Sequence, residues 1–302
     1  MNRTLMNIAA VERETGLGKD TLRVWERRYG FPQPERDQHG ERAYPLEQVE
    51  KLRLVKRLMG QGLRPGRLLA ASDADLAQLG APVTAPEVGT AEGGICATLL
   101  PLIRQHDLPA VSNALRQTLH RQGLQHFVLE TVSALNRAVG EAWMRGEIEV
   151  FEEHLYTEQM QALLRQAIGG LPPGDRPRIL LTTVPEEQHV LGLLMIEALL
   201  TLDGANCVSL GTQTPLADIR LAAQAQRADI VALSFSAAFP VRQVLPLLSQ
   251  LRPMLDPRTE LWAGGAALER LAQPPGVQLM RHLRDALAGL TSWREAKAHR
   301  GS

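Results

Sequence analysis

The spacing of apolar residues changes along the 302-residue chain and predicts three structured regions. In the first, apolar residues recur at helical spacing in three short segments, at residues 7–15, 19–29 and 47–60. The second keeps helical spacing with few β-branched runs and predicts four helices, at residues 95–105, 108–121, 122–141 and 147–168. Beyond about residue 176, short β-branched runs alternate with helical segments, which is typical of a parallel sheet covered by helices.

The order of these regions predicts a multidomain α and α/β protein. We expect a winged helix-turn-helix head over residues 1–75, a linker rich in Pro and Gly over 76–92, and a four-helix bundle over 93–172. A doubly wound, flavodoxin-like parallel sheet is predicted over residues 176–302. Its strands are expected at residues 179–183, 205–210, 230–235 and 260–263, with helices at 191–202, 216–227, 241–251 and after Ala266.

Composition excludes several classes of protein. The hydrophobic content of 44% and the charged content of 22% are those of an ordinary globular chain, and no apolar run is long enough to span a bilayer. The sequence begins without the layout of a signal peptide, and its two cysteines, Cys96 and Cys207, indicate neither a disulfide framework nor a zinc site. We therefore expect a cytoplasmic protein without a membrane partner.

The net charge of +0 hides an uneven distribution of charge. Residues 1–70 carry 14 basic and 9 acidic side chains, whereas the rest of the chain carries 19 basic and 24 acidic ones. A basic head on an acidic body indicates that only the head meets a polyanion.

The basic head has the layout of a DNA-binding module. Its first two predicted helices are joined by a turn with two glycines, Gly16 and Gly18, and residues 37–44 are predicted to form a β-turn wing. The side chains expected to contact DNA are Lys19, Arg23, Trp25, Arg27, Arg28, His39, Arg42 and Tyr44. Of these, Trp25 could equally well be a core residue, and Arg28 and His39 are typical of solvated surface. For the head as a whole, the alternative to a DNA-binding module is a helical module that binds protein.

The head also carries a specific motif. Residues 21–32, which read Thr-Leu-Arg-Val-Trp-Glu-Arg-Arg-Tyr-Gly-Phe-Pro, are followed by Gly40-x-Arg42-x-Tyr44. This pattern resembles the winged-helix head of MerR-type transcription regulators, and most of all the branch with Trp-Glu-Arg-Arg-Tyr-Gly in this place. The resemblance implies that the head binds double-stranded operator DNA.

One loop of the α/β region carries candidate cofactor chemistry. Residues 184–192 follow a predicted strand and contain Glu187-x-His189-x-x-Gly192. Imidazole is a common transition-metal ligand, and a carboxylate bonded to its other nitrogen would fix its tautomer. Because one histidine cannot build a metal site from protein ligands, any metal here would arrive within a cofactor. An ordinary loop histidine is the alternative.

Two further loops at predicted strand ends carry small residues. Ser234 and Ser236 follow one strand, and Gly264 and Gly265 follow another. Small hydroxyls and paired glycines leave room for a long ligand tail beside the sheet. A dinucleotide phosphate is the competing use of such glycines, although the pattern Gly-x-Gly-x-x-Gly does not occur in the sequence.

The helical region contributes an aromatic residue and two polar ones. Nine residues separate Trp143 from the pair Glu153-His154, with Gly146 between them. An aromatic ring beside a carboxylate and an imidazole can stack on and hydrogen-bond a flat polar ligand such as a nucleoside. A core tryptophan near an ordinary helix start is the alternative.

Taken together, the three loops resemble the cobalamin-binding domain of methionine synthase and of corrinoid mutases over about residues 176–290. The resemblance implies that His189 replaces the nucleotide base as the lower cobalt ligand and is oriented by Glu187, which stands where the family usually has aspartate. It also implies that Gly192 and Ser236 border the cofactor, whose base tail is buried between Ser234 and the Gly264-Gly265 turn.

The pattern of Trp143 with Glu153-His154 resembles the helical cap of adenosylcobalamin-dependent photoreceptor repressors of the CarH and LitR type. In that family the head, the cap and the cobalamin domain occur in this order, and the cap covers the upper face and the adenosyl group. The resemblance implies a repressor rather than an enzyme. It also implies a tetramer on DNA in the dark, which disperses when light cleaves the Co–C bond.

One residue departs from the family pattern. The residue after the cap tryptophan is usually a histidine that takes the upper cobalt position after illumination, whereas here it is Met144. A thioether is softer than imidazole and neutral at every pH, so Met144, His154 or a water are the candidates for that position, unless Met144 only fills space. A light-independent sensor of cobalamin on the same scaffold is therefore the second hypothesis. A corrinoid methyl carrier or mutase subunit is the third, disfavoured because the head has no role there and no substrate barrel fits this length.

Overall fold

The computed structural model describes residues 5–37, 40–60, 64–72, 75–76 and 93–300. Nearly all of the linker expected over residues 76–92 lies outside the described residues, as does His39. The chain divides into two compact units, one of Met1–His106 with Leu135–His154 and the other of Asp107–Ala134 with Leu155–Ser302. Helices of the predicted bundle therefore contribute to both units.

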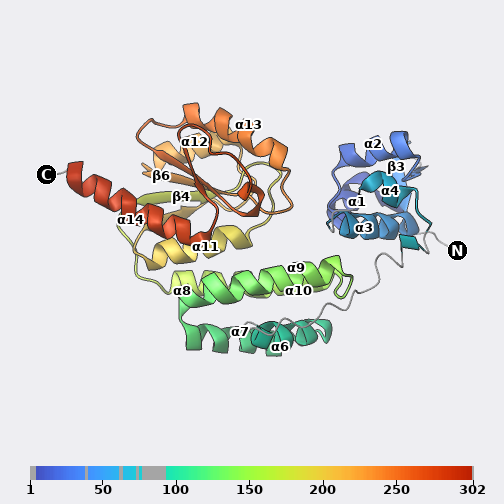
Figure 1. Ribbon diagram of the computed structural model, residues 1–302, viewed down its shortest axis with the longest axis horizontal. Helices are drawn as coiled ribbons and strands as arrows, with labels where there is room; N and C mark the ends of the chain where they lie inside the picture. Colours follow the sequence, from blue (N-terminus) through green and yellow to red (C-terminus); the bar gives the residue numbers. More distant parts are fainter. Residues whose placement is uncertain (1–4, 38–39, 61–63, 73–74, 77–92, 301–302) are drawn as a thin grey trace. The chain divides into compact units, whose positions relative to one another are not determined.

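Short helices and a small antiparallel sheet build the head (Figure 1). Helices α1 (Ile8–Thr15), α2 (Lys19–Tyr29) and α3 (Leu46–Gly60) lie where the apolar spacing predicts them, and α4 (Pro65–Leu69) follows. Across the sheet the order is β1 (Leu5–Asn7), β3 (Arg42–Pro45) and β2 (Glu35–Arg36). Strands β2 and β3 pair around the wing predicted at residues 37–44, whereas β1 and α4 are too short to be recognised from periodicity.

Local signals in the sequence explain where the helices of the head begin and end. The side chain of Asn7 accepts a hydrogen bond from the backbone N–H of Ala10 at 2.8 Å and so caps α1. Gly16 and Gly30, with φ 64° and 68°, end α1 and α2 in the left-handed conformation that glycine adopts without strain. The apolar faces of the helices close over a shared core that includes Val11, Leu22, Trp25, Tyr44 and Leu52.

Residues 93–169 are helical in the predicted order. Gly146, with φ 71°, lies in the turn before the last helix, where the sequence predicts a break. The third predicted helix contains a π-helical segment, which periodicity does not reveal. None of the described helices is both long and apolar enough to cross a membrane. The elements are α6 (Gly93–Arg104), α7 (Leu108–Gln122), the continuous run α8 (Leu124–His126), η1 (Phe127–Val132) and α9 (Ser133–Met144), and then α10 (Val150–Gly169).

The α/β region is a five-stranded parallel sheet in the order β5-β4-β6-β7-β8. Counted along the region, this is the order 2-1-3-4-5 of flavodoxin-like sheets, as the sequence predicts. The strands are β4 (Arg178–Thr182), β5 (Asn206–Ser209), β6 (Ile230–Ser234), β7 (Glu260–Gly264) and β8 (Val277–Met280).

Helices cover both faces of this sheet (Figure 1). Side chains alternate between the faces along each strand, because a strand has a period of two. Leu180 and Val231 share a core with α12 (Leu216–Ala225) and α13 (Val241–Leu251). Ile179 and Ile230 share another with α11 (Leu191–Leu202) and α14 (Leu283–Arg300). The two cores fix the strands, and hence the positions of the loops at their carboxyl ends.

The helix expected after Ala266 is α14, but it starts only at Leu283, and the strand that precedes it is not predicted from the sequence. A 3-10 turn, η3 (Ala266–Leu268), follows β7, and the chain then forms the edge strand β8. Pro274 and Pro275 interrupt a helix, and Gly276, with φ 69°, turns the chain into β8. The four residues of β8 are too few to give a clear alternation of apolar and polar positions.

Candidate functional site

Strands β4 and β6 are neighbours in the sheet although β5 lies between them in sequence. The chain leaves β4 for α11 on one face and β6 for α13 on the other. This is the topological switch point, where open α/β sheets bind their ligands. Residues 183–190 connect β4 to α11, and residues 235–240 connect β6 to α13, so both loops lie at that point.

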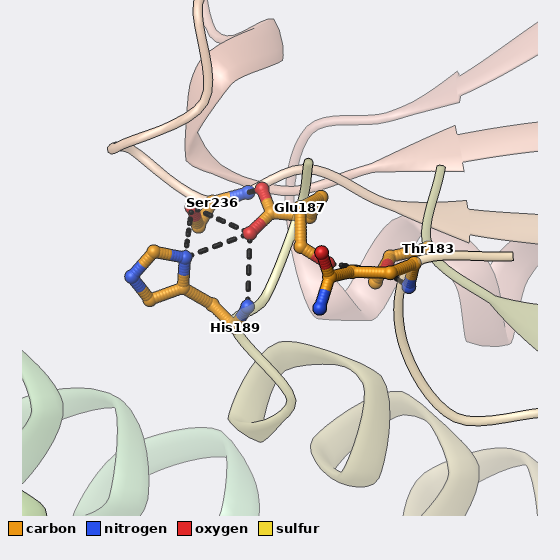
Figure 2. Close-up of polar contacts among 5 residues, drawn as sticks. Thr183, Glu187, His189 and Ser236 are labelled. Carbon is orange, nitrogen blue, oxygen red and sulfur yellow. Dashed lines mark hydrogen bonds and ion pairs between the residues drawn. The ribbon is translucent and has the colours of Figure 1, made fainter. Parts of the chain in front are cut away.

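Glu187 joins these two loops (Figure 2). Its Oε1 accepts hydrogen bonds from the backbone N–H of His189 at 3.0 Å and from the ring nitrogen Nδ1 of His189 at 2.7 Å. Its Oε2 accepts the backbone N–H of Ser236 at 2.7 Å. The Ser236 hydroxyl donates to Oε1 at 3.2 Å and lies 3.0 Å from His189 Nδ1. One carboxylate therefore holds both loops and the imidazole together.

The backbone of Glu187 is also held. The hydroxyl of Thr183, directly after β4, donates to the Glu187 carbonyl at 2.6 Å and accepts from the backbone N–H of Gln213 at 2.8 Å (Figure 2). Thr183 is not predicted as a site residue from the sequence, because threonine is common in β-strands. Its position directly after a strand and before the switch-point loop is the signal that could identify it.

The electrostatics of Glu187 define the state of the histidine. Only 1% of Glu187 is exposed, and burial by itself raises the pKa of a carboxyl group. The hydrogen bonds from His189 and Ser236 outweigh burial, so the pKa of Glu187 lies below its ordinary value. The carboxylate is then ionised at neutral pH and only accepts hydrogen bonds, which assigns the proton of the neutral His189 ring to Nδ1. The lone pair is left on Nε2, the atom that ligates metals in such pairs.

The His189 ring is accessible, with 59% of its side chain exposed. In Figure 2, Nε2 points away from Glu187 and Ser236. Within the part of the chain that the structure describes, no group of three or more His, Cys, Asp or Glu side chains is arranged to hold a metal ion. The accessible Nε2 of His189 could therefore supply one nitrogen ligand to a metal carried by a cofactor.

Four more of the predicted residues line a narrow cavity beside this cluster. The cavity measures about 80 Å³ and lies between the ends of β6 and β7 and the starts of α11 and α14. This volume is well below the range of about 300–1,000 Å³ that is typical of pockets for small organic ligands, so an aromatic base would need the walls to move apart. We call it the glycine cavity; it is lined by Gly192, Ser234, Gly264 and Gly265, with Leu193, Ile196, Trp262 and Met280 among its apolar residues.

Close backbone approach explains the glycines of this cavity. A Cβ atom on Gly192 would lie 2.9 Å from the Oγ of Ser234. Gly265 has φ 112°, and a Cβ atom there would lie 2.1 Å from the carbonyl oxygen of Phe235. No side chain fits at Gly265 without moving the backbone.

The residues predicted for the cap belong to the other compact unit. Trp143 and Met144 are the last residues of α9 and are half-buried, and Glu153 and His154 lie in the first two turns of α10. The side chains of Glu153 and His154 approach to 3.6 Å, and 69% of the His154 side chain is exposed. All four residues flank the turn that contains Gly146.

Ion pairs that no sequence motif indicates hold this turn. Glu147 accepts hydrogen bonds from Arg145 at 2.5 Å and from Arg104 at 2.8 Å. The bond from Arg145 is the main reason that the pKa of Glu147 lies below its ordinary value. Nε2 of His106 lies 3.0 Å from the buried Glu152, which ties the end of α6 to the start of α10.

In the head, most of the predicted DNA-contact residues are accessible. Lys19, Arg23, Arg27 and Arg28 all lie on α2 with exposed or half-exposed side chains. Lys19 lies 3.5 Å from Glu12, and Arg23 lies 3.2 Å from Asp20, both as surface ion pairs. On β3, Arg42 donates to Glu26 of α2 at 2.8 Å, and this pair joins the wing to the second helix.

Two predicted contact residues are core residues instead. Trp25 is 5% exposed and Tyr44 is 0% exposed, and both pack in the core of the head. The prediction that Tyr44 contacts DNA is corrected, because its ring has no surface to offer a ligand. Trp25 takes the core role that the sequence left open. His39 lies outside the described residues.

Two family models match the chain. The model of the MerR HTH family regulatory protein matches residues 6–68, and that of the B12 binding domain matches residues 95–168. Over 270 residues the chain is 32% identical to the HTH-type transcriptional repressor CarH of Myxococcus xanthus, with 87% of this chain and 88% of that protein covered. The chain belongs to the CarH family. The resemblance that the sequence motifs indicate is thereby confirmed.

Two other proteins extend this comparison. The HTH-type transcriptional repressor CarA of Myxococcus xanthus is 29% identical over 269 residues, with 88% of each chain covered. A solved monomethylamine corrinoid protein of Methanosarcina barkeri aligns with a TM-score of 0.51 and 16% identity over 67% of this chain and 100% of its own, which shows the fold alone. The CarH family, the MerR head and the B12 binding domain show a cobalamin-binding transcriptional regulator rather than an enzyme.

Proposed function

We propose that this member of the CarH family is a repressor whose binding to operator DNA is controlled by adenosylcobalamin and by light. The observation that carries the proposal is the cluster of Glu187, His189 and Ser236 at the switch point of the sheet. When bound, the cofactor supplies a cobalt–carbon bond that light breaks. The protein must then hold both faces of the cofactor and transmit the change to its head.

The lower face is assigned to His189. The buried carboxylate of Glu187 keeps the ring proton on Nδ1 and orients the ring, which raises the basicity of Nε2 as a cobalt ligand. Ser236 approaches the same ring nitrogen, with its hydroxyl 3.0 Å from Nδ1, and so helps to fix the direction of the ring. The ring is therefore ordered before any ligand arrives, which reduces the entropy penalty of binding.

The displaced nucleotide base is assigned to the glycine cavity. Gly192, Gly264 and Gly265 keep it free of side chains, and its apolar residues suit a flat aromatic ring. The competing ligand, a dinucleotide phosphate, is less well supported because the walls are mostly apolar and Arg281, a cation in the lining, already donates to the Leu271 carbonyl at 2.8 Å. Entry of the base requires the cavity to widen, and we assign that movement to the starts of α11 and α14.

The upper face is assigned to the four residues around Gly146. An indole ring at Trp143 can stack on adenine, while Glu153 and His154 can hydrogen-bond the adenosyl hydroxyls. Loss of the adenosyl group would remove these contacts. A ligand shifts an assembly equilibrium only through such a difference in binding to the two states.

DNA binding is assigned to the basic side of α2. Arg23, Arg27 and Arg28 offer cations to phosphates and base edges, whereas Arg42 supports the wing through Glu26. In a tetramer, several heads act together and their weak contacts multiply into useful affinity. Dispersal of the tetramer by light would therefore release the operator.

Met144 favours a second candidate function, a light-independent sensor of cobalamin. A thioether binds softer metal states better than cobalt(III), so Met144 is a poor substitute for the histidine that usually occupies its place. His154 is the other candidate for the upper position, since it lies across the same turn and is largely exposed.

The proposal is tested by loading the purified protein with adenosylcobalamin in the dark. The absorption spectrum, the mass by light scattering and the affinity for operator DNA are then measured before and after green light. We expect a tetramer that loses mass and DNA affinity as its spectrum changes. A changed spectrum at constant mass would favour the light-independent sensor, and absence of cobalamin uptake would contradict both functions.

The assignment of the lower ligand has its own control. His189→Ala should change the spectrum of the bound cofactor, because imidazole coordination is lost. His120→Ala, on the exposed surface of α7, should leave that spectrum unchanged. Identical spectra for the two variants would show that His189 does not coordinate cobalt.

A further inference from the structure

A second cavity lies at the edge of the sheet opposite to His189. It measures about 550 Å³ and is formed where β6 and β7 begin, by the end of α12, the connection from α13 to β7, and α14. This volume falls within the range of about 300–1,000 Å³ that is typical of pockets for small organic ligands. The proposed function makes no use of this cavity.

The charges that line this cavity are unbalanced. Asp229 accepts the backbone N–H of Arg178 at 2.9 Å, and Asp256 accepts that of Arg258 at 2.7 Å, so both acids already have structural partners. In the described part of the chain, none of the four basic side chains lies within ion-pair distance of a carboxylate. We call it the basic cavity; its charged residues are Arg220, Arg227, Arg258, Lys297, Asp229 and Asp256.

The wall that carries Arg258 is fixed by hydrogen bonds. The guanidinium of Arg252 donates to the carbonyl oxygens of Thr259 at 2.6 Å and Asp256 at 2.7 Å. The hydroxyl of Thr259 donates to the carbonyl of Ala228 at 3.0 Å, which joins this loop to the turn between α12 and β6. The rim of the basic cavity is therefore preorganised, which lowers the ordering penalty for a ligand.

Arg227 adds an observation from the backbone. It has φ 50° in the turn after α12, a left-handed conformation in which glycine is the favoured residue. A cation at this point also interacts favourably with the carboxyl end of α12. Arg227→Gly separates the two roles, because it relieves the backbone while removing the guanidinium from the cavity.

We propose that the basic cavity binds a small phosphate monoester with an apolar body, such as a nucleoside monophosphate. Guanidinium groups match phosphate oxygens with paired, charge-assisted hydrogen bonds. Met254, Leu255 and Ala223 line the same cavity and offer apolar surface to the rest of the ligand. The regulator thus has a second ligand site at the edge of the sheet remote from cobalamin.

Calorimetric titration of the full-length protein with adenosine monophosphate tests this proposal. Adenosine, which lacks the phosphate, and inorganic phosphate, which lacks the apolar body, should each bind more weakly than the nucleotide. Arg258→Gln and Arg227→Gly should each weaken nucleotide binding by roughly tenfold, as expected for loss of a charge-assisted contact. Arg242→Gln, at the start of α13 and outside the cavity, should leave binding unchanged.

The variants are chosen so that unfolding cannot imitate loss of binding. Glycine suits the backbone at position 227, so Arg227→Gly should keep or raise the thermal midpoint while it weakens binding. Absence of nucleotide binding, or equal losses in Arg242→Gln and Arg258→Gln, would overturn the proposal. So would displacement of the nucleotide by non-operator duplex DNA, which would assign the cavity to a nucleic-acid backbone. Since the titration uses protein without cobalamin, its outcome is independent of the proposed function.

Discussion

Two carboxylate–imidazole pairs in this chain are built in opposite ways. In the pair of Glu187 and His189 the interacting atoms are 2.7 Å apart and the acid is 1% exposed. In the pair of Glu153 and His154 they are 3.6 Å apart, and the side chains are 36% and 69% exposed. The first pair bridges two loops above the packed core of a sheet, whereas the second joins adjacent residues of a single helix.

The difference shows that the surroundings, rather than the residue types, decide what such a pair can do. A buried carboxylate with several donors fixes the tautomer and direction of its histidine, as a permanent metal ligand requires. An exposed pair contributes only about 0–1 kcal/mol to the stability of the fold. Such a pair can therefore form and break as a ligand group arrives and leaves. In our proposal the permanent face of cobalamin meets the fixed pair and the changing face meets the adjustable one.

The largest effect is expected at Gly265, where the backbone makes the sheet edge rigid. In Gly265→Ala the new Cβ would lie 2.1 Å from the Phe235 carbonyl oxygen at φ 112°. We expect a loss of about 3 kcal/mol or more in the free energy of unfolding, together with loss of cobalamin binding. Urea denaturation measures the first and absorption titration the second.

Gly211 provides the matched control for Gly265. Its φ is 78°, but a Cβ atom there would have nothing within 4 Å. Gly211→Ala should therefore lose only about 1–2 kcal/mol from the left-handed backbone. Equal stability of the two variants would contradict a rigid edge at the glycine cavity.

The next effect is expected at Glu187, which tests the comparison directly. Glu187→Gln replaces a buried acceptor by an amide that must leave one donor of the cluster unsatisfied, so we expect a loss of about 2–3 kcal/mol in the free energy of unfolding. Cobalamin affinity should fall by roughly 10–100-fold, as for other partners that orient a metal-bound histidine. Glu153→Gln should change stability by less than about 0.5 kcal/mol. If both substitutions have the same effect, the two pairs do not differ as their geometry indicates.

The same contrast explains how far the site could be predicted from the sequence. Glu187, His189 and Gly192 lie close together in the sequence after an apolar strand, so a local pattern is enough to find them. The bond between Glu187 and Ser236 joins residues 49 positions apart and exists because β4 and β6 are neighbours. The resemblance to a known domain implied that neighbourhood, whereas the contact between Glu187 and Ser236 required the structure.

Elements were missed where the physical signal is weak or absent in the sequence. The strand β8 has four residues, and the π-helical segment η1 keeps the apolar spacing of the helices on either side. Tyr44 was placed correctly in the wing, but the sequence does not show which side of a four-residue strand faces the core. Short edge strands and the direction of individual side chains are therefore less predictable from the sequence than the order of the domains.

A smaller effect is expected from acid. The pKa of Glu187 in the folded protein lies below its ordinary value of 4.5. The ionised carboxylate therefore stabilises the fold above that pH, and this stabilisation is lost as the pH falls through the folded pKa. Unfolding free energies measured from pH 7 to pH 3 should therefore fall less steeply in Glu187→Gln than in the wild type. The pKa of Glu147 is also lowered, so some of the acid sensitivity should remain in every variant. Parallel curves for Glu187→Gln and the wild type would contradict this assignment.

The smallest effect on stability, within about 0.5 kcal/mol, is expected from Met144→His, because Met144 is a half-buried residue at a helix end. Its effect on light chemistry should be distinct. If Met144 stands where an upper ligand belongs, a histidine there should give the illuminated protein the spectrum of cobalt held between two imidazoles. His154→Ala in the same background should not remove that spectrum. If Met144→His leaves the spectrum of the photoproduct unchanged and His154→Ala alters it, His154 supplies the upper ligand. Each of the two carboxylate–imidazole pairs would then provide one histidine ligand to cobalt.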